Sequence, residues 1–433
     1  MKIYIDFLLI CIAILPKINI IKISGNSTGI RIEDIIISIY LILEMISVIK
    51  KRKIKLESKD LITISKYFFI YIMIASISTM YGLIRGWVQP IISMLYLMRK
   101  IEYFCLIFVG YNYMKQIKDI TKLKSKINFV VLFHFAFSIL QLLGLVGSFN
   151  GGVEKETLTQ GRVSSTFNGA YEFSAFLLLL LPIYLNEILN NKDDKKINYL
   201  MIIIILLDIY ISQSRSSLII ALLIFILMFV KIKKISMEKF FIRFTVAILG
   251  IIIIFVAVNN QKIDLSRFDK INVSSIINIF EITWKSRSFE DYLKNNNWYG
   301  YSTYSLTTIE NLGMDASMYV RISHWVQMID GLCMSPILGL GVSISGTAAD
   351  GNYIRILCES GILGIIAWFT LMWKIYKSLN TKQDMSRITR YAFISIAIGA
   401  TLIDIFEASK VMMIFWFMLG VTYANNFLRD KNE

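Results

Sequence analysis

Long apolar runs recur along nearly the whole chain, and they constrain the fold more than any other feature. Apolar residues make up 56% of the 433 residues, which is more than a soluble core of this size needs. A hydrocarbon layer about 30 Å thick requires roughly 20 mainly apolar residues per helix. The runs are continuous rather than alternating, so helices are favoured over a membrane barrel. The sequence therefore predicts an all-α polytopic membrane protein.

We expect about twelve transmembrane helices in this chain. They fall near residues 3–21, 33–49, 61–80, 95–114, 127–147, 169–189, 198–212, 217–230, 243–258, 356–376, 391–405 and 409–427. The formal charge of +15 is gathered in short Lys/Arg clusters that follow the even-numbered spans. Such clusters mark the cytoplasmic side, so both termini are predicted to be cytoplasmic and no nucleic-acid partner is expected.

The pattern of spans divides the chain into three segments. Residues 1–258 form an N-terminal membrane domain of about nine spans, residues 259–355 a large extracytoplasmic loop, and residues 356–433 a C-terminal segment of about three spans. A loop of this length is usually functional or disordered. Its aromatic residues favour an ordered cap. They are Trp284, Trp298, Tyr299, Tyr301, Tyr304 and Trp325.

Four arginines are predicted to lie at or beyond the outer face, where short loops normally lack positive charge. They are Arg162, Arg215, Arg321 and Arg355. Guanidinium groups bind phosphate in a bidentate manner and keep their charge, so these positions indicate an anion site. The alternative is an arginine that extends toward lipid headgroups. Arg215 favours the first interpretation because serines flank it between two short apolar runs.

The end of the large loop carries a second set of polar residues. Asp350 follows a glycine-rich stretch and precedes Arg355, and it can act as a general base, a metal ligand or half of an ion pair. Gly361 and Gly364 fall on one face of the next predicted helix, where they allow close approach of a backbone or ligand or serve ordinary helix packing.

Further acidic residues lie near the same predicted face. Asp208 is a candidate partner of Arg215 inside a span. Asp404, Glu407 and Lys410 are spaced by three, so they either complete the polar site or form a local ion-pair cluster. Two histidines and four cysteines without metal-type spacing indicate no metal site.

The order of these motifs resembles the O-antigen polymerase and O-antigen ligase superfamily. The chain has Gly-Arg-x-Ser-Ser-Thr-Phe before a span, Ser-x-Ser-Arg-Ser between two spans, Arg-x-x-x-Trp in the large loop, then Pro-x-x-Gly-x-Gly and Glu-x-Gly-x-x-Gly. The resemblance covers roughly residues 160–370. It implies a GT-C-like membrane fold and glycosyl transfer that needs no metal or other cofactor.

The resemblance also implies the substrates and the roles of the residues. The donor and acceptor would be undecaprenyl-diphosphate-linked oligosaccharides in the bacterial cytoplasmic (inner) membrane, joined on its outer face into O-antigen, capsular or exopolysaccharide. A chain-length regulator is a further expected partner. Arg215 and Arg321 map onto the arginines that hold the diphosphate, with Arg162 a weaker candidate.

Where ligases of this superfamily have a histidine, this chain has Asp350, which favours a polymerase. We therefore predict Arg215, Arg321 and Asp350 as catalytic, with inversion at the transferred sugar. The predicted substrate-binding residues are Arg162, Arg355, Trp325 and Tyr353. The alternatives are a ligase that transfers glycan to another acceptor, and a flippase or transporter of the same lipid-linked glycan.

Overall fold

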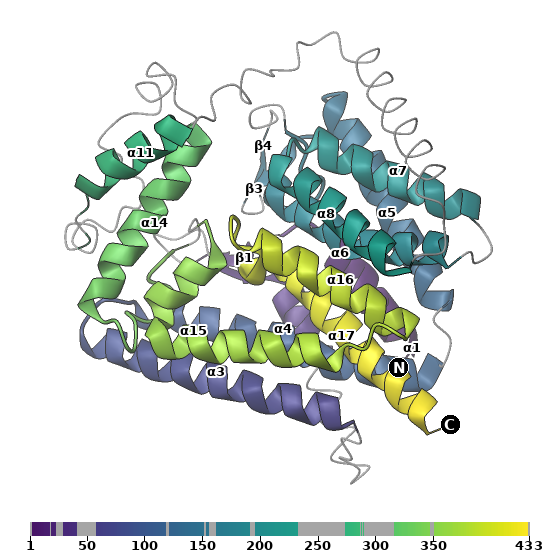
Figure 1. Ribbon diagram of the computed structural model, residues 1–433, viewed down its shortest axis with the longest axis horizontal. Coiled ribbons are helices and arrows are strands. Elements are labelled where there is room, and N and C mark those ends of the chain that lie inside the picture. The colour runs from purple at the N-terminus through teal and green to yellow at the C-terminus, as the bar shows by residue number, and fades with distance from the viewer. Residues whose placement is uncertain are drawn as a thin grey trace.

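The computed structural model is built almost entirely from helices (Figure 1). It describes residues 2–17, 19–22, 29–40, 58–117, 121–150, 153–155, 162–190, 195–232, 273–285, 287, 289, 316–346 and 350–431. The α-helices within these residues include α1 (Lys2–Ile14), α3 (Lys59–Ile84), α4 (Pro90–Ile117), α5 (Thr121–Leu142), α6 (Ala170–Leu189), α7 (Lys195–Ile211), α8 (Arg215–Ile232), α11 (Val273–Lys285), α14 (Ala316–Met334), α15 (Asn352–Ser378), α16 (Asp384–Gly399) and α17 (Ser409–Asp430). A 3-10 turn, η3 (Ile405–Glu407), precedes α17.

The structure is consistent with the predicted all-α class, and two small antiparallel hairpins add to the helices. β1 (Asn19–Lys22) pairs with β2 (Gly29–Arg31), and β3 (Ser148–Asn150) pairs with β4 (Val153–Lys155). The first hairpin follows directly on α1, which ends at Ile14 instead of near residue 21. Pro16 explains the early end, because the residue before a proline is disfavoured in the α-helical conformation.

Among the described residues, five helices are long and apolar enough to cross a membrane: α3, α6, α15, α17 and residues 123–142 of α5. The membrane character predicted from the sequence is therefore supported, while the count of twelve spans stays a prediction. The predicted span 243–258 lies outside the described residues, as do residues 41–49 of the second span. The helix α15 begins at Asn352, slightly before the predicted end of the large loop at residue 355.

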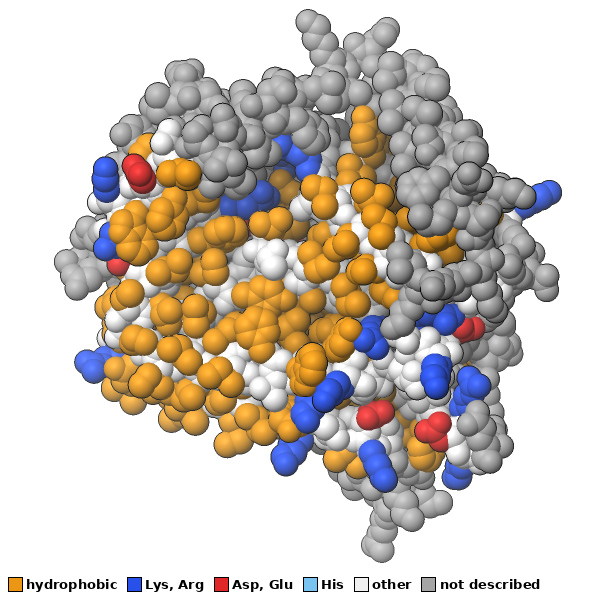
Figure 2. Space-filling model, viewed as in Figure 1, with side chains coloured by type: hydrophobic (Ala, Val, Ile, Leu, Met, Phe, Trp, Pro, Cys, Tyr) orange, Lys and Arg blue, Asp and Glu red, His pale blue; other side chains and the backbone are white. Residues whose placement is uncertain are grey.

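The outer surface of the bundle is broadly apolar over α3 and α15 (Figure 2). On α3, Phe69 is 56% exposed and Met73 is 63% exposed. A soluble monomer rarely exposes a patch of this extent, whereas a lipid-facing surface requires it. By contrast, 89% of the residues in the most apolar stretch of α6 are buried, so α6 forms the centre of the bundle.

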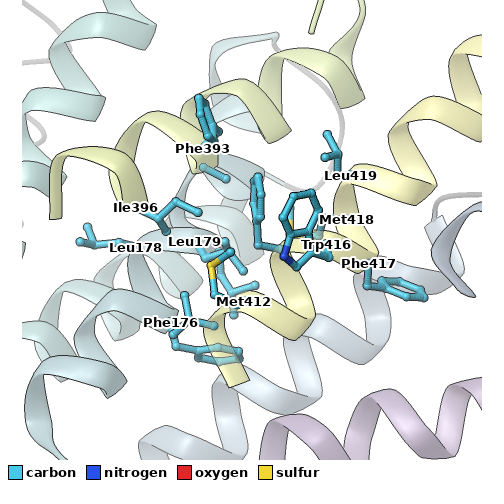
Figure 3. Packing of buried hydrophobic residues seen from close by; sticks show 14 of the residues in the cluster. Phe176, Leu178, Leu179, Phe393, Ile396, Met412, Trp416, Phe417, Met418 and Leu419 are labelled. Atoms are coloured by element: carbon cyan, nitrogen blue, oxygen red, sulfur yellow. The ribbon is translucent and has the colours of Figure 1, made fainter. Parts of the chain in front are cut away.

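The core is built where α17 packs against α4, α6 and α16 (Figure 3). Glycines allow α4 and α17 to touch through their backbones. A Cβ atom added at Gly110 would lie 2.1 Å from the carbonyl oxygen of Phe417, and one at Gly420 would lie 2.0 Å from that of Ile107. Small residues at such crossings permit the close helix contacts that membrane proteins use.

The helix α15 is broken inside its apolar stretch, at Gly361. This glycine has φ 64° and ψ −166°, a conformation that side chains essentially forbid. The loop that follows α14 bonds to the freed backbone: Leu340 N donates to Cys358 O at 2.9 Å, and Ile362 N donates to Pro336 O at 2.9 Å. Irregular backbone is tolerated in a membrane protein only where other protein groups satisfy it. The interpretation of Gly361 as part of a regular helix face is therefore wrong.

We predict that Gly361→Ala destabilises the fold by about 3 kcal/mol or more. Its Cβ atom would meet the carbonyl oxygen of Ile337 at 2.2 Å and would also strain φ. Thermal unfolding of the purified protein in detergent measures the effect. Gly86→Ala is the matched control: it has φ +72° but nothing within 4 Å of its Cβ atom, so strain alone should cost about 1 kcal/mol. Equal losses in the two variants would contradict this role of the Gly361 contact.

Candidate functional site

Segments that the sequence predicts on one side of the membrane converge at one end of the helix bundle. The backbone N–H of Asn352, at the start of α15, donates to the carbonyl oxygen of Ala400 at 2.9 Å. Near the start of α17, Lys410 Nζ donates to the carbonyl oxygen of Thr166 at 3.0 Å. Polar residues separated by hundreds of positions in the chain are therefore assembled into one region.

A tyrosine at the start of α6 joins two of the predicted arginines. The guanidinium carbon of Arg162 lies 5.3 Å from the ring centroid of Tyr171, and that of Arg321 lies 5.1 Å from it. The Nη1 atom of Arg162 also donates to the Tyr171 hydroxyl at 2.9 Å. An aromatic ring attracts cations and reduces the cost of holding two of them close together.

Arg321 and Trp325 lie one turn apart on α14, so both side chains face the same neighbour. That neighbour is the segment just before α15. Arg321 Nε is 3.5 Å from Asp350 Oδ2, and Trp325 Nε1 donates to the carbonyl oxygen of Asp350 at 2.5 Å. A Cβ atom at Gly351 would lie 2.8 Å from Trp325 Nε1, which explains a glycine there. The Arg-x-x-x-Trp spacing thus holds Asp350 by both its carboxylate and its backbone.

The environment of Asp350 opposes its ionisation. Burial raises the pKa of the Asp350 carboxyl above its ordinary value, and the positive charge of Arg321 partly offsets that shift. The side chains remain accessible, with exposed fractions of 33% for Asp350 and 15% for Arg321. A partly exposed carboxylate with a raised pKa, beside a cation, can accept a proton from an incoming hydroxyl group.

Arg215 begins α8, and a chain of serine hydroxyls ties its position to α6. Ser214 Oγ and Ser217 Oγ are 2.7 Å apart, Ser217 Oγ and Ser174 Oγ are 2.8 Å apart, and Ser174 Oγ donates to the carbonyl oxygen of Tyr171 at 3.0 Å. The serines near Arg215 therefore hold the start of α8 close to Tyr171, whose ring lies beside Arg162 and Arg321.

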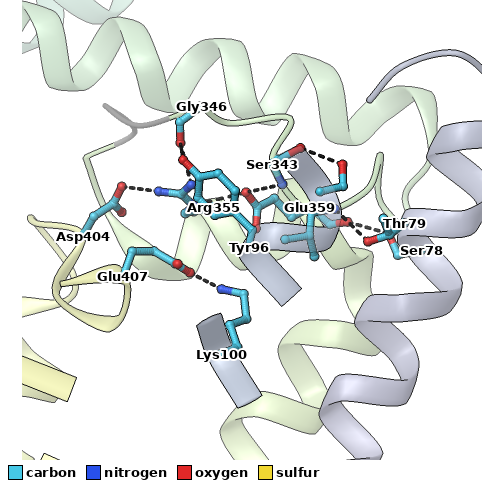
Figure 4. A network of polar contacts seen from close by, with 12 residues as sticks. Ser78, Thr79, Tyr96, Lys100, Ser343, Gly346, Arg355, Glu359, Asp404 and Glu407 are labelled. Atoms are coloured by element: carbon cyan, nitrogen blue, oxygen red, sulfur yellow. Dashed lines mark hydrogen bonds and ion pairs between the residues drawn. The ribbon is translucent and has the colours of Figure 1, made fainter. Parts of the chain in front are cut away.

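Arg355 is the buried centre of a separate polar network (Figure 4). It is 1% exposed, and each of its three nitrogens has a partner. Nε donates to Glu359 Oε1 at 3.1 Å, Nη1 to Asp404 Oδ2 at 2.6 Å, and Nη2 to the carbonyl oxygen of Gly346 at 2.6 Å. These contacts favour a scaffold role, and the predicted substrate binding by Arg355 stays a prediction.

Tyr353 is placed in a similar, internal way. Its hydroxyl donates to the carbonyl oxygen of Ala397 at 2.7 Å, and its ring stacks on Phe369 with centroids 5.3 Å apart. The ring also lies edge-on to Phe406 at 5.8 Å. The side chain joins α15 to the end of α16, while the substrate-binding role predicted for it stays a prediction.

The three charged residues that lead into α17 interact with other elements rather than forming a local cluster. Asp404 pairs with Arg355 of α15, and Glu407 pairs with Lys100 of α4 (Figure 4). Lys410 is 2% exposed and also donates to Thr166 Oγ1 at 2.9 Å. The prediction of a local ion-pair cluster is therefore wrong, because the 3-10 turn η3 directs these side chains toward different neighbours.

Asp208 is fully buried within α7. No ion pair joins it to Arg215 within the part of the chain that the structure describes. The partnership proposed from their proximity in sequence is therefore not formed. The aromatic residues Trp298, Tyr299, Tyr301 and Tyr304 lie outside the described residues.

The sequence analysis missed the roles of two participants. Tyr171 lies nine residues after Arg162, and only its position between two arginines identifies it. Glu359 is part of the glycine motif, but its pairing with Arg355 could have been found from the i, i+4 spacing on a helix. Among the described residues, no group of three or more His, Cys, Asp or Glu side chains could hold a metal ion.

Comparison with known proteins found no relative of this chain. No protein-family model matches the chain, and no curated protein is significantly similar to it.

We predict that Arg355→Met destabilises the protein by about 3–5 kcal/mol. The substitution would leave the Glu359 and Asp404 carboxylates buried without their cation. Thermal unfolding in detergent measures this loss. The triple variant Arg355→Met, Glu359→Gln, Asp404→Asn should recover much of the stability because no buried charge is left unpaired. If the triple variant is stable but loses substrate binding, the scaffold role is insufficient and the predicted substrate contact gains support.

Proposed function

We propose that this protein is a glycosyltransferase that polymerises undecaprenyl-diphosphate-linked oligosaccharide repeat units into O-antigen, capsular or exopolysaccharide. The observation that carries the proposal is the position of Arg321, with its guanidinium group beside both the Tyr171 ring and the Asp350 carboxylate. A cationic group and a candidate base are thus adjacent and accessible. The motif order that resembles the O-antigen polymerase and ligase superfamily supports the same conclusion.

The two arginines at Tyr171 suit a donor with a diphosphate leaving group. Glycosyl transfer from a polyprenyl diphosphate releases a group with several negative charges, and fixed guanidinium groups stabilise that charge as it develops. Arg321 and Arg162 would bind phosphate oxygens, and Arg215 would add a third cation from the start of α8. Tyr171 would keep the first two cations together before the donor arrives.

Asp350 would serve the acceptor. The hydroxyl oxygen of the acceptor sugar attacks the anomeric carbon of the donor, and the bond from that carbon to the phosphate oxygen breaks. The electron pair leaves with the diphosphate, and the hydroxyl proton passes to the Asp350 carboxylate. Attack on the face opposite the leaving group inverts the anomeric centre. The residues of this scheme require no cofactor, and Trp325 would hold Asp350 in place through its backbone.

The proposed location is the outer face of the bacterial cytoplasmic membrane, with both termini in the cytoplasm. The lysine-rich clusters support this orientation. The bilayer and the lipid-linked donor and acceptor would be its direct partners, and a chain-length regulator a further one.

Reconstitution of the purified protein tests the class of reaction. Proteoliposomes would receive lipid-linked repeat units and no other enzyme, and the products would be separated by length. Growth of a ladder of longer glycans is the expected result. Transfer only to an acceptor that lacks polyprenyl diphosphate would identify a ligase, and movement across the bilayer without bond formation a flippase. Either outcome would overturn the polymerase assignment.

We predict that Arg321→Gln and Arg215→Gln each lower the rate of polymer formation at least about 100-fold while the protein still inserts and folds. Loss of one fixed positive group removes stabilisation of the departing diphosphate. The measurement is initial rate in the same proteoliposomes. Arg85→Gln is the matched control, because Arg85 caps the end of α3 beside Tyr81 and does not contact Tyr171 or Asp350 in the described contacts. An unchanged rate in Arg321→Gln would remove this residue from the diphosphate site.

We also predict an acid limit on turnover that depends on Asp350. A base acts when deprotonated, so the rate should fall as pH drops through the raised pKa of Asp350, above the range of an ordinary aspartate. Asp350→Asn should reduce the rate strongly and abolish this acid limit. Asp330→Asn removes a carboxylate of α14 that pairs with Arg287, away from Asp350, and should leave the profile unchanged. Persistence of the acid limit in Asp350→Asn would assign the proton transfer to another group.

A further inference from the structure

Three faces of different character run along α11, the helix that packs against α14. Successive residues of an α-helix are turned by roughly 100°, so residues three or four apart share a face. One face is buried and contains Ile279 and Thr283. The two remaining faces are exposed, one apolar and one polar. They consist of Ile277, Phe280 and Trp284, and of Asn278, Glu281 and Lys285. The exposed apolar face therefore lies between the buried face and the polar face.

The buried face already accounts for the contact with α14. Ile279 is 1% exposed and belongs to an apolar cluster with three residues of α14. These are Tyr319, Ile322 and Val326. The Thr283 hydroxyl donates to the carbonyl oxygen of Ile279 at 2.8 Å, within α11 itself. The second apolar face is therefore available for a different neighbour.

Large side chains form this exposed apolar face. Ile277 is 53% exposed, Phe280 46% and Trp284 37%. The rings of Phe280 and Trp284 stack one helical turn apart, with centroids 5.6 Å apart and an angle of 17° between their planes. Single exposed apolar residues are ordinary, whereas a continuous strip of them marks a contact with a partner or a membrane.

A short link connects the end of α11 to the lipid-facing surface of the bundle. Arg287 Nε lies 3.3 Å from Asp330 Oδ1 of α14, and the N–H of Phe289 donates to Asp330 Oδ2 at 3.0 Å. Phe289 belongs to the same apolar cluster as Val88, which follows the membrane-spanning helix α3. Apolar side chains lie over α11 on the same face of the molecule as those over α3 and α15 (Figure 2). The link therefore places α11 near the end of a membrane span.

The end of α3 and the end of α11 carry the same combination of groups. The guanidinium carbon of Arg85 lies 5.4 Å from the ring centroid of Tyr81 and 6.0 Å from that of Trp87. The guanidinium carbon of Arg287 lies 4.0 Å from the ring centroid of Trp284. Tryptophan and tyrosine are enriched where a membrane protein crosses the boundary between lipid and water. The composition of both ends therefore suits the headgroup level of the bilayer.

We propose that α11 is an interfacial helix and that Ile277, Phe280 and Trp284 insert into the outer leaflet of the lipid bilayer. The bilayer surface offers an apolar phase beside water, which matches the neighbouring apolar and polar faces of this helix. The third face stays on α14. A protein segment bound to the apolar face would exclude lipid from it, so the accessibility of this face to lipid-soluble and water-soluble probes distinguishes the two occupants.

Insertion of α11 would fix the depth of α14 relative to the bilayer. Ile279 packs in one cluster with Ile322, which directly follows Arg321 in the sequence. The guanidinium group of Arg321 would thereby be held near the level of the lipid headgroups. The inference does not depend on the proposed glycosyltransferase activity, because it concerns only the contact of α11 with lipid. Its failure would leave that activity untouched.

Spin labels on the full-length protein in proteoliposomes test the contact. One label is attached through Phe280→Cys, and the matched control through Glu281→Cys, at the adjacent residue on the polar face. Both changes are made in Cys333→Ser, since Cys333 is the exposed native cysteine, and that variant alone gives the background signal. Oxygen, which concentrates in hydrocarbon, should relax the label at residue 280 more than a water-soluble nickel chelate does. The reverse is expected at residue 281.

Three results of this measurement would overturn the proposal. Stronger relaxation by the nickel chelate at both positions would place α11 in water. Stronger relaxation by oxygen at both would place the whole helix in hydrocarbon. Shielding of residue 280 from both reagents would show that a protein segment covers the apolar face.

Paired variants test whether the apolar face holds α11 in the bilayer. With a label attached through Ile277→Cys, Phe280→Ser combined with Trp284→Ser should shift that label from oxygen access to nickel access, because interfacial binding follows the buried apolar area. Asn278→Ser combined with Glu281→Ser changes the polar face of the same helix and should leave oxygen access unchanged. An equal shift in both pairs would overturn the role of the apolar face. The labels at residues 280 and 281 decide the question even if a paired variant does not fold.

Discussion

A charge buried among apolar helices must have a partner, and this requirement organises one whole end of the molecule. Arg355 is the centre of that end, because its guanidinium group binds Glu359, Asp404 and the backbone of Gly346 together. The cost of removing each charge from water is recovered only if all groups are paired at once. The pairing therefore fixes α15, the loop after α14 and the segment before α17 relative to each other. Lys100 and Glu407 extend the same constraint to α4.

The accessible site is attached to this buried network through a short stretch of backbone. Asp350 and Gly351 precede α15, and Asn352 bonds on both sides: its N–H donates to Ala400, and its Oδ1 accepts from the N–H of Phe406 at 2.9 Å. Trp325 holds Asp350 from α14. The carboxylate is thus held at the edge of a rigid assembly, which suits a group that must keep its position during a reaction.

The arginines that the sequence groups together fall into two physical classes. Arg355 is enclosed and uses every nitrogen within the protein, so it stabilises the fold. Arg162 and Arg321 lie against the ring of one tyrosine, and Arg321 is in addition 3.5 Å from the Asp350 carboxylate, so they have fewer fixed acceptors than Arg355. The difference lies in burial and in the number of fixed acceptors, neither of which the local sequence around an arginine reveals.

The sequence by itself determined the membrane character and most helix positions, whereas the roles predicted for the segments around Arg162, Arg215, Arg321 and Asp350 stay predictions. Those features depend on hydropathy, charge position and local spacing, which are properties of short stretches of chain. The tertiary structure alone decided which groups meet: Tyr171 with two arginines, Arg355 with Asp404, and Lys410 with Thr166. It also decided that α15 breaks at Gly361, since the freed backbone is satisfied by the loop from Pro336 to Gly341 and by Ser78 of α3. Contacts between residues distant in the chain depend on how helices pack around the central α6, and no local pattern encodes them.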